Sequence, residues 1–134
     1  MAHFRKEVEI AAPGDHAWDA LRDVGALHTR LVLGFVTDCR LEGDVRTVTF
    51  ANGAVAKERM VDVSESERRV AWSAAGGPLS HHNASAQVVS LGPDRCKVVW
   101  IVDLLPNEMA QPIAAMVDAA LMAMKKTLES APRG

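Results

Sequence analysis

Tyrosine is absent from the 134 residues, and aromatic side chains as a whole make up only 4% of the chain. Without tyrosine, no mechanism that uses a tyrosine hydroxyl as its general acid is available. Cysteine is scarce as well, because Cys39 and Cys96 are the only two and they do not form a Cys-x-x-Cys pair. We expect both to be small buried residues of a protein in the reducing cytoplasm.

The sequence also lacks a strong excess of one charge and a long apolar run. The formal net charge of −2 gives no electrostatic reason to expect a nucleic-acid partner. No apolar run approaches the roughly 20 residues that a membrane span needs. The first ten residues, MAHFRKEVEI, alternate apolar and charged side chains instead of forming a signal-peptide core. We therefore expect no membrane insertion. No glycine-rich nucleotide-binding motif is present, so we also expect no cofactor.

What the sequence does contain is enough apolar material for one substantial core. Apolar residues make up 49% of the chain, and no repeat, linker or low-complexity segment divides it. We therefore expect a single domain over residues 1–134. A domain of this length is large enough to hold an internal cavity.

Alternation and turn residues predict most of the chain to be β-structure. Phe4, Val8 and Ile10 share one face of an N-terminal strand, and two short helical segments are expected between Pro13 and residue 34. Between residues 35 and 105, turn-forming residues separate six further strands, and their short connections favour antiparallel pairing. The six stretches are VTDCRLEG, VRTVTFANG, AVAKERMVDVSE, RRVAWSAAGG, SHHNASAQVVSLG and RCKVVWIVDLLP.

A long helix is predicted after Pro106. Asn107 is a suitable N-cap, and apolar residues then recur at spacings of three and four as far as Leu128. The helix spans about 22 residues, hence roughly 33 Å, which is long enough to cross a whole sheet. A curved antiparallel sheet wrapped on one helix leaves a space between them, and this space is the natural place for a ligand.

This order of elements, with VAKERMVDVSESERRVAWS, GGPLSHHNASAQV and VVWIVDLLP, resembles the START-like superfamily over residues 3–130. More narrowly, it is similar to the bacterial SRPBCC group of polyketide cyclases/dehydrases and lipid-transport proteins. The resemblance implies an α+β helix-grip fold, in which a curved seven-stranded antiparallel sheet wraps around the C-terminal helix. It also implies an internal cavity that takes hydrophobic or amphipathic small molecules. Receptors, lipid carriers and aromatic polyketide cyclases share this scaffold, so the fold alone does not fix the function.

Two acids are candidates for the polar part of such a site. Glu58 lies in mid-strand on the face of Ala56 and Met60, and the resemblance implies that a charged residue at this position projects into the cavity. A solvent-facing ion pair is the alternative, since the opposite face of the strand is not cleanly polar and a bulge could change the register. Asp103 lies within the apolar run VVWIVDLLP. It is expected either to face the cavity or to cap a neighbouring element.

The stretch His81-His82-Asn83 opens one predicted strand just after Gly76-Gly77-Pro78. Because neighbours in a strand point to opposite faces, the two histidines do not suit one metal ion, and we expect no metal site. Either the three residues are ordinary polar strand residues, or some of them line the cavity. The resemblance implies that the preceding glycine-rich loop gates the cavity, against the alternative of an ordinary hairpin loop.

Large apolar residues are expected to form the cavity wall. Trp72 is a candidate on its strand, as are Met60 and the methionines Met116 and Met124 of the long helix, whose side chains are flexible and polarizable. Core packing is the alternative for each of them.

Three functions follow, and the sequence leaves them open. The first is binding of a hydrophobic small molecule or lipid, with Glu58, Asp103 and the His81–Asn83 segment as polar contacts. The second is a cyclase/dehydrase-like enzyme in which Glu58 or Asp103 is the general base and a histidine its acid partner. The third is a protein-interaction module or homodimer, which would be favoured if the apolar stripe Val98, Trp100, Val102 and Leu104 faces outward.

Overall fold

The computed structural model describes residues 1–74 and 76–130, so residues 75 and 131–134 of the predicted domain lie outside the described part. Seven strands form one antiparallel sheet in the order β1-β7-β6-β5-β4-β3-β2. The strands are β1 Ala2–Ile10, β2 Val36–Glu42, β3 Val45–Phe50, β4 Val55–Ser64, β5 Arg69–Ala74, β6 His81–Gly92 and β7 Arg95–Leu105. The six consecutive strands after residue 35 pair as hairpins, as their short turns predict, and β1 closes the other edge by pairing with β7.

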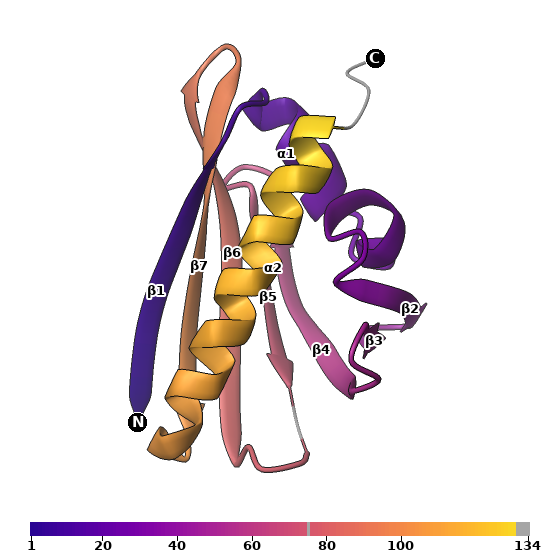
Figure 1. Cartoon of the computed structure of the whole chain (residues 1–134), viewed down its shortest axis with the longest axis vertical. Helices are drawn as coiled ribbons and strands as arrows, with labels where there is room; N and C mark the ends of the chain where they lie inside the picture. Colours follow the sequence, from indigo (N-terminus) through magenta and orange to yellow (C-terminus); the bar gives the residue numbers. More distant parts are fainter. Residues whose placement is uncertain (75, 131–134) are drawn as a thin grey trace.

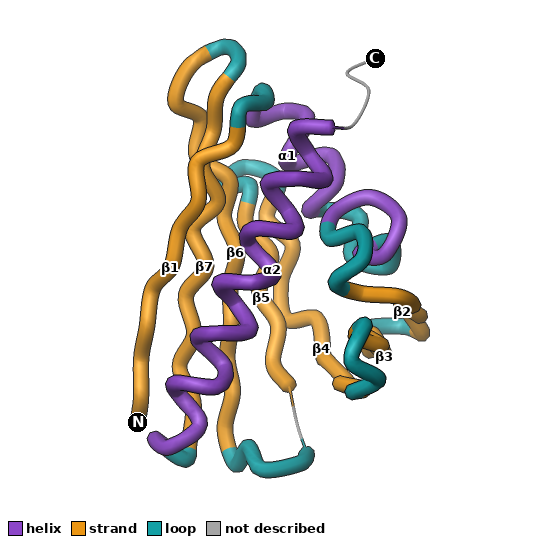
Figure 2. The backbone as a smooth tube through the Cα atoms, viewed as in Figure 1, coloured by secondary structure: helices purple, strands orange, loops and turns teal. Residues whose placement is uncertain are grey.

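The helices lie on one face of this sheet (Figures 1 and 2). Between β1 and β2 the chain forms a short helix α1, Gly14–Leu21, and a single π-helical turn η1, Leu27–Leu31. A short 3₁₀ turn η2, Asn107–Met109, leads into the long helix α2, Ala110–Ser130. Figure 1 shows α2 lying diagonally across the sheet, and it contacts β1, β7 and η1. The predicted helix-grip architecture is therefore confirmed.

The core lies between the sheet and α2. Every second residue of β7 faces it, and Val98, Val102 and Leu104 are almost fully buried. The opposing stripe of α2 recurs at helical spacing and consists of Val117, Ala120, Leu121, Met124 and Leu128. The stripe proposed above as an outward interaction surface thus lies inside the protein, and that argument for a partner surface is wrong. β7 carries apolar residues on both faces, so its alternation does not reveal which face is buried.

A bulge in β4 sets the direction of its side chains. The pairing of β4 with β5 shifts between Met60 and Asp62, which leaves Val61 as the extra residue. On the N-terminal side of the bulge, Glu58 and Met60 take the inner face, while Val61 is 62% exposed. The bulge that the sequence left possible therefore lies just beyond Glu58 and leaves that residue on the inner face.

Candidate functional site

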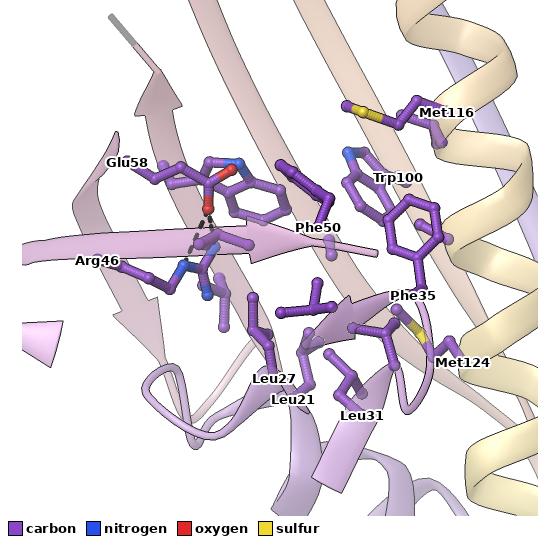
Figure 3. Close-up of a pocket in the computed structure, with 18 residues that line it drawn as sticks. Leu21, Leu27, Leu31, Phe35, Arg46, Phe50, Glu58, Trp100, Met116 and Met124 are labelled. Carbon is purple, nitrogen blue, oxygen red and sulfur yellow. Dashed lines mark hydrogen bonds and ion pairs between the residues drawn. The ribbon is translucent and has the colours of Figure 1, made fainter. Parts of the chain in front are cut away.

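An apolar pocket lies between the sheet, α2 and the segment that joins α1 to β2 (Figure 3). The sheet contributes side chains from six strands, β2 to β7, of which the apolar ones are Val36, Val48, Phe50, Val70, Trp72, Ala86 and Trp100. Helix α2 contributes Met116, Val117, Ala120 and Met124, and the chain from the end of α1 to the start of β2 adds Leu21, Leu27, Leu31, Val32 and Phe35. In Figure 1 the strands β2 and β3 lie apart from α2.

The free volume of the pocket is small, about 70 Å³. This is room for a few water molecules, whereas sites for drug-sized ligands usually measure about 300–1,000 Å³. Movable side chains border it. Met116 is 38% exposed, and Phe35 and Phe50 meet edge to face with ring centroids 5.6 Å apart. A larger molecule enters only if some of these side chains change rotamer.

One wall of the pocket carries a buried ion pair between Arg46 of β3 and Glu58 of β4. The two residues are register partners, and Arg46 Nε and Nη2 lie 2.9 and 2.6 Å from Glu58 Oε1. The side chain of Arg46 is only 4% exposed and that of Glu58 14%. The third guanidinium nitrogen, Nη1, donates to the carbonyl oxygen of Val24 at 3.2 Å. Each charge therefore has a partner, as burial requires.

Trp72 connects this ion pair to the rest of the pocket. The guanidinium carbon of Arg46 lies 5.3 Å from the centroid of the Trp72 ring, within the range of a cation–π interaction. On its other side Trp72 meets Trp100 at a centroid distance of 5.4 Å and an interplanar angle of 73°. This edge-to-face contact is a favoured geometry for aromatic pairs. Polar and aromatic groups thus form one continuous wall on the inner face of the sheet.

Arg46 was missed in the sequence analysis, although the signal for it was present. In the stretch VRTVTF, Arg46 shares its face with Val48 and Phe50, so simple alternation places it inward. The reasoning that singles out an acid in an apolar strand applies equally to this arginine.

The candidate residues named from the sequence fall into three groups. Glu58, Trp72, Met116 and Met124 line the pocket, and Met60 packs against the core without lining it. The remaining candidates, His81, His82, Asn83 and Asp103, lie outside the pocket.

Asp103 lies on the outer face of β7. Its carboxylate is 2.7 Å from Nδ1 of His3, which is its register partner in β1, and both side chains are largely exposed. The apolar neighbours that suggested a cavity position belong to a strand that is apolar on both faces. Asp103 and His3 form a surface pair.

His82 faces inward, while Asn83 is exposed on the opposite side. Nδ1 of His82 accepts a hydrogen bond from the backbone N–H of Ala74 at 3.1 Å. The pairing of β5 with β6 ends at Trp72 and Ala84, so the imidazole supplies an acceptor where the two strands diverge. Burial lowers the pKa of His82, and the nearby His81 lowers it further.

The loop before β6 is a compact turn. Gly76 and Gly77 have φ values of 97° and 61°, which favour glycine, and Gly76 bridges to Leu79. Ser80 then donates its N–H to the carbonyl oxygen of Leu105. The described part of this loop contributes no side chain to the pocket, and its gating role stays a prediction.

Two further properties concern the described residues as a whole. In residues 1–74 and 76–130, no three histidine, cysteine or acidic side chains are grouped so that they could hold a metal ion. Within the same residues, no helix has the length and apolar character needed to cross a membrane.

A family model described as polyketide cyclase / dehydrase and lipid transport matches residues 1–129. No curated protein matches the sequence. Among solved structures, the protein XoxI from Bacillus cereus has a TM-score of 0.85 at 19% identity, and the alignment covers 97% of both chains.

Two other solved structures connect the fold to named groups. The Zhui aromatase/cyclase from Streptomyces sp. R1128 has a TM-score of 0.77 at 20% identity, with 96% of this chain and 93% of that chain covered. A START superfamily protein from Mycobacterium smegmatis has a TM-score of 0.72 at 15% identity, with 94% and 98% covered. At these identities the structural likeness establishes the fold alone.

Proposed function

The chain belongs to the polyketide cyclase / dehydrase and lipid transport family, and from this premise we propose that it binds a hydrophobic or amphipathic small molecule between the sheet and α2. The observation that carries the proposal is the pocket itself, in which an almost wholly apolar wall surrounds one buried ion pair, Arg46–Glu58. Apolar side chains with a few fixed polar groups are the usual composition of small-molecule sites.

The energetics of such binding rest on apolar area. Burial contributes about 25 cal/mol for each Å² of apolar surface removed from water, less the cost of ordering the partners. The small free volume means that a larger ligand must first displace side chains of the wall. Met116 is suited to this role, since it is partly exposed and methionine adopts many rotamers at low cost.

Native mass spectrometry of the freshly purified protein, followed by denaturing extraction, tests the proposal. A bound mass that is released on unfolding and partitions into organic solvent is the expected result. An empty protein that also fails to take up added apolar molecules would overturn it.

Two alanines of α2 provide a matched pair of variants for this experiment. Ala120 lines the pocket and is 3% exposed, whereas its neighbour Ala119 is exposed. Ala120→Leu fills part of the pocket, at a stability cost of about 1–3 kcal/mol for overpacking. It is expected to lose the bound mass, while Ala119→Leu keeps it. Circular dichroism of both variants shows whether they remain folded.

A cyclase/dehydrase-like reaction in the same pocket is the alternative, and the family description favours it. The geometry gives it less support, because the pocket-lining residues include Glu58 but neither Asp103 nor a histidine that could act as its partner. In an assay with a reactive polyketide analogue, loss of turnover in a folded Glu58→Gln variant would favour the enzyme.

The remaining expectations are part of the proposal. Cytoplasmic localisation is supported by Cys39 and Cys96, both of which are buried free thiols. Cell fractionation tests it. A homodimer stays a prediction, and light scattering over a range of concentrations tests it.

A further inference from the structure

The pocket contains a buried hydrogen-bond donor without a partner. Nε1 of Trp100 is buried, and it forms no hydrogen bond with any of the described residues. A donor in this state costs about 1–3 kcal/mol, and native proteins contain few such groups. The group therefore needs an explanation, and its position offers one.

Trp18 shows how this chain treats another buried indole. Trp18 is 6% exposed, and its Nε1 donates to Glu65 at 2.7 Å. Trp100 differs because it lies on the inner face of the sheet, where it lines the pocket. In the view of Figure 3, its indole nitrogen is on the edge that faces Met116, the partly exposed residue of α2. A molecule that displaces the Met116 side chain would reach this edge.

The chemistry of the donor restricts its partner. An indole N–H donates and does not accept, so the ligand must bring an acceptor such as a carbonyl oxygen.

The other polar group of the pocket restricts the charge of the ligand. Nε and Nη1 of Arg46 donate to Glu58 and to the carbonyl oxygen of Val24, and Nη2 lies 2.6 Å from Glu58 Oε1 in an ion pair. The carboxylate of Glu58 balances the positive charge. No lining residue offers a free cation, because Arg46 is the only lysine, arginine or histidine among the residues that line the described pocket. An anionic ligand would therefore lose its hydration without gaining a counter-charge.

Building on the proposed function, we propose that the pocket selects a neutral ligand whose carbonyl-type oxygen accepts a hydrogen bond from Trp100 Nε1 and whose remaining surface is apolar. The acceptor lies close to an apolar ring or chain of the ligand, because the residues that line the pocket with Trp100 are almost all apolar. Trp100 is then the residue that determines specificity.

Three one-ring probes of similar size test the inference: acetophenone, isopropylbenzene and benzoate. Acetophenone carries the carbonyl acceptor, isopropylbenzene replaces it with an apolar group, and benzoate carries a charge. Dissociation constants come from NMR titration of the whole chain, and the indole N–H resonances are followed at the same time. Trp100→Phe identifies the Trp100 signal and removes the donor.

A comparison between two variants isolates the hydrogen bond from the loss of wall area. Trp100→Phe should weaken acetophenone binding by about tenfold more than isopropylbenzene binding, which corresponds to one hydrogen bond. Trp72→Phe is the matched control, since it also shortens a pocket-lining indole, and it should weaken both probes equally. In the unmodified protein, acetophenone should move the Trp100 indole proton downfield and isopropylbenzene should not.

The outcomes separate this inference from the function on which it rests. One outcome is that both neutral probes bind, while Trp100→Phe weakens them equally and the indole proton shows no selective shift. In that case Trp100 does not donate to the carbonyl oxygen, and the inference fails while the proposed function stands. If benzoate binds more tightly than acetophenone, selection for a neutral ligand is overturned. If neither neutral probe binds, the proposed function fails and the inference fails with it. If Trp100→Phe does not fold, Trp18→Phe and Trp72→Phe identify the other two indole signals, and the shift of the remaining one decides the question.

Discussion

Arg46 donates a hydrogen bond from Nε to Oε1 of Glu58, directly across the pairing of β3 with β4, and its Nη2 forms an ion pair with the same oxygen. Both side chains are largely removed from water, and the guanidinium also lies over the Trp72 ring. The pair is therefore part of the protein interior and not one of the exposed ion pairs that cover the sheet. This distinction can be measured.

Breaking the pair is expected to destabilise the fold strongly. Glu58→Ala should lower the free energy of unfolding by about 3–5 kcal/mol, because it leaves the Arg46 charge buried without a partner. The double variant Arg46→Met with Glu58→Leu should recover most of this loss, since no charge remains. Urea denaturation of the three proteins gives the values.

The exposed pair Arg59–Asp44 serves as the control for that experiment. Its nitrogen and oxygen are 3.9 Å apart, and both side chains are more than 60% exposed. Arg59→Ala should cost less than about 1 kcal/mol. Equal losses in Glu58→Ala and Arg59→Ala would contradict the interior role of Arg46–Glu58.

His82 should make the protein less stable in mild acid. Its pKa is lowered in the folded state, so below about pH 6.5 the unfolded chain takes up a proton that the folded chain does not. Stability should therefore fall as the pH drops through this value, and the fall should level off below the folded-state pKa. Protonation of Nδ1 would also remove the acceptor for the Ala74 N–H.

Thermal melts between pH 8 and 5 measure this effect. His82→Gln should make the melting temperature less dependent on pH. His81→Gln, which changes the half-buried neighbour, should retain most of the pH dependence. An unchanged slope in His82→Gln would assign the acid sensitivity to another group.

Glu65 should titrate at unusually low pH, and Trp18 should report it. Hydrogen bonds from the Trp18 indole and then from Arg22 lower the pKa of Glu65. The indole N–H resonance of Trp18 should shift as Glu65 is protonated, with a midpoint below the ordinary value of about 4.3. The hydrogen bonds to the Glu65 carboxylate stabilise the fold above the ordinary pKa of about 4.3, and this stabilisation is lost as the pH falls through the lowered pKa. In Glu65→Gln the transition should vanish, and a midpoint at the ordinary value would refute the assignment.

Both thiols should be unreactive in the native protein. Burial raises the pKa of Cys39 and of Cys96, and both side chains are almost inaccessible. Because the thiolate is the reactive form, alkylation by iodoacetamide at pH 8 should be at least about tenfold slower than in the urea-unfolded chain. Rapid labelling of either cysteine under native conditions would show that its surroundings open.

The fold was predictable because turn residues and alternation recur along the chain. Asn52-Gly53 and Gly92-Pro93-Asp94 mark hairpins without reference to distant residues, and the spacing of apolar residues in α2 indicates its buried stripe. The helix-grip architecture agrees with this order. Local signals were sufficient because six of the strands pair with their sequence neighbours.

The site was only partly predictable, because it depends on register between distant strands. Asp103 is paired with His3, a contact across 100 residues that no local pattern reveals. Glu58 could be placed on the inner face, but its partner Arg46 comes from the neighbouring strand and was not considered. Trp100 Nε1 forms no hydrogen bond with the described residues, and this depends on how the core is assembled.

The contact between Trp72 and Trp100 has a practical consequence. Two of the three tryptophans of this chain line the pocket, and the chain has no tyrosine whose emission would overlap theirs. The third, Trp18, lies outside the pocket and is held by Glu65. The protein therefore carries its own optical reporter, and in a Trp18→Phe background its ultraviolet emission arises from the pocket wall alone.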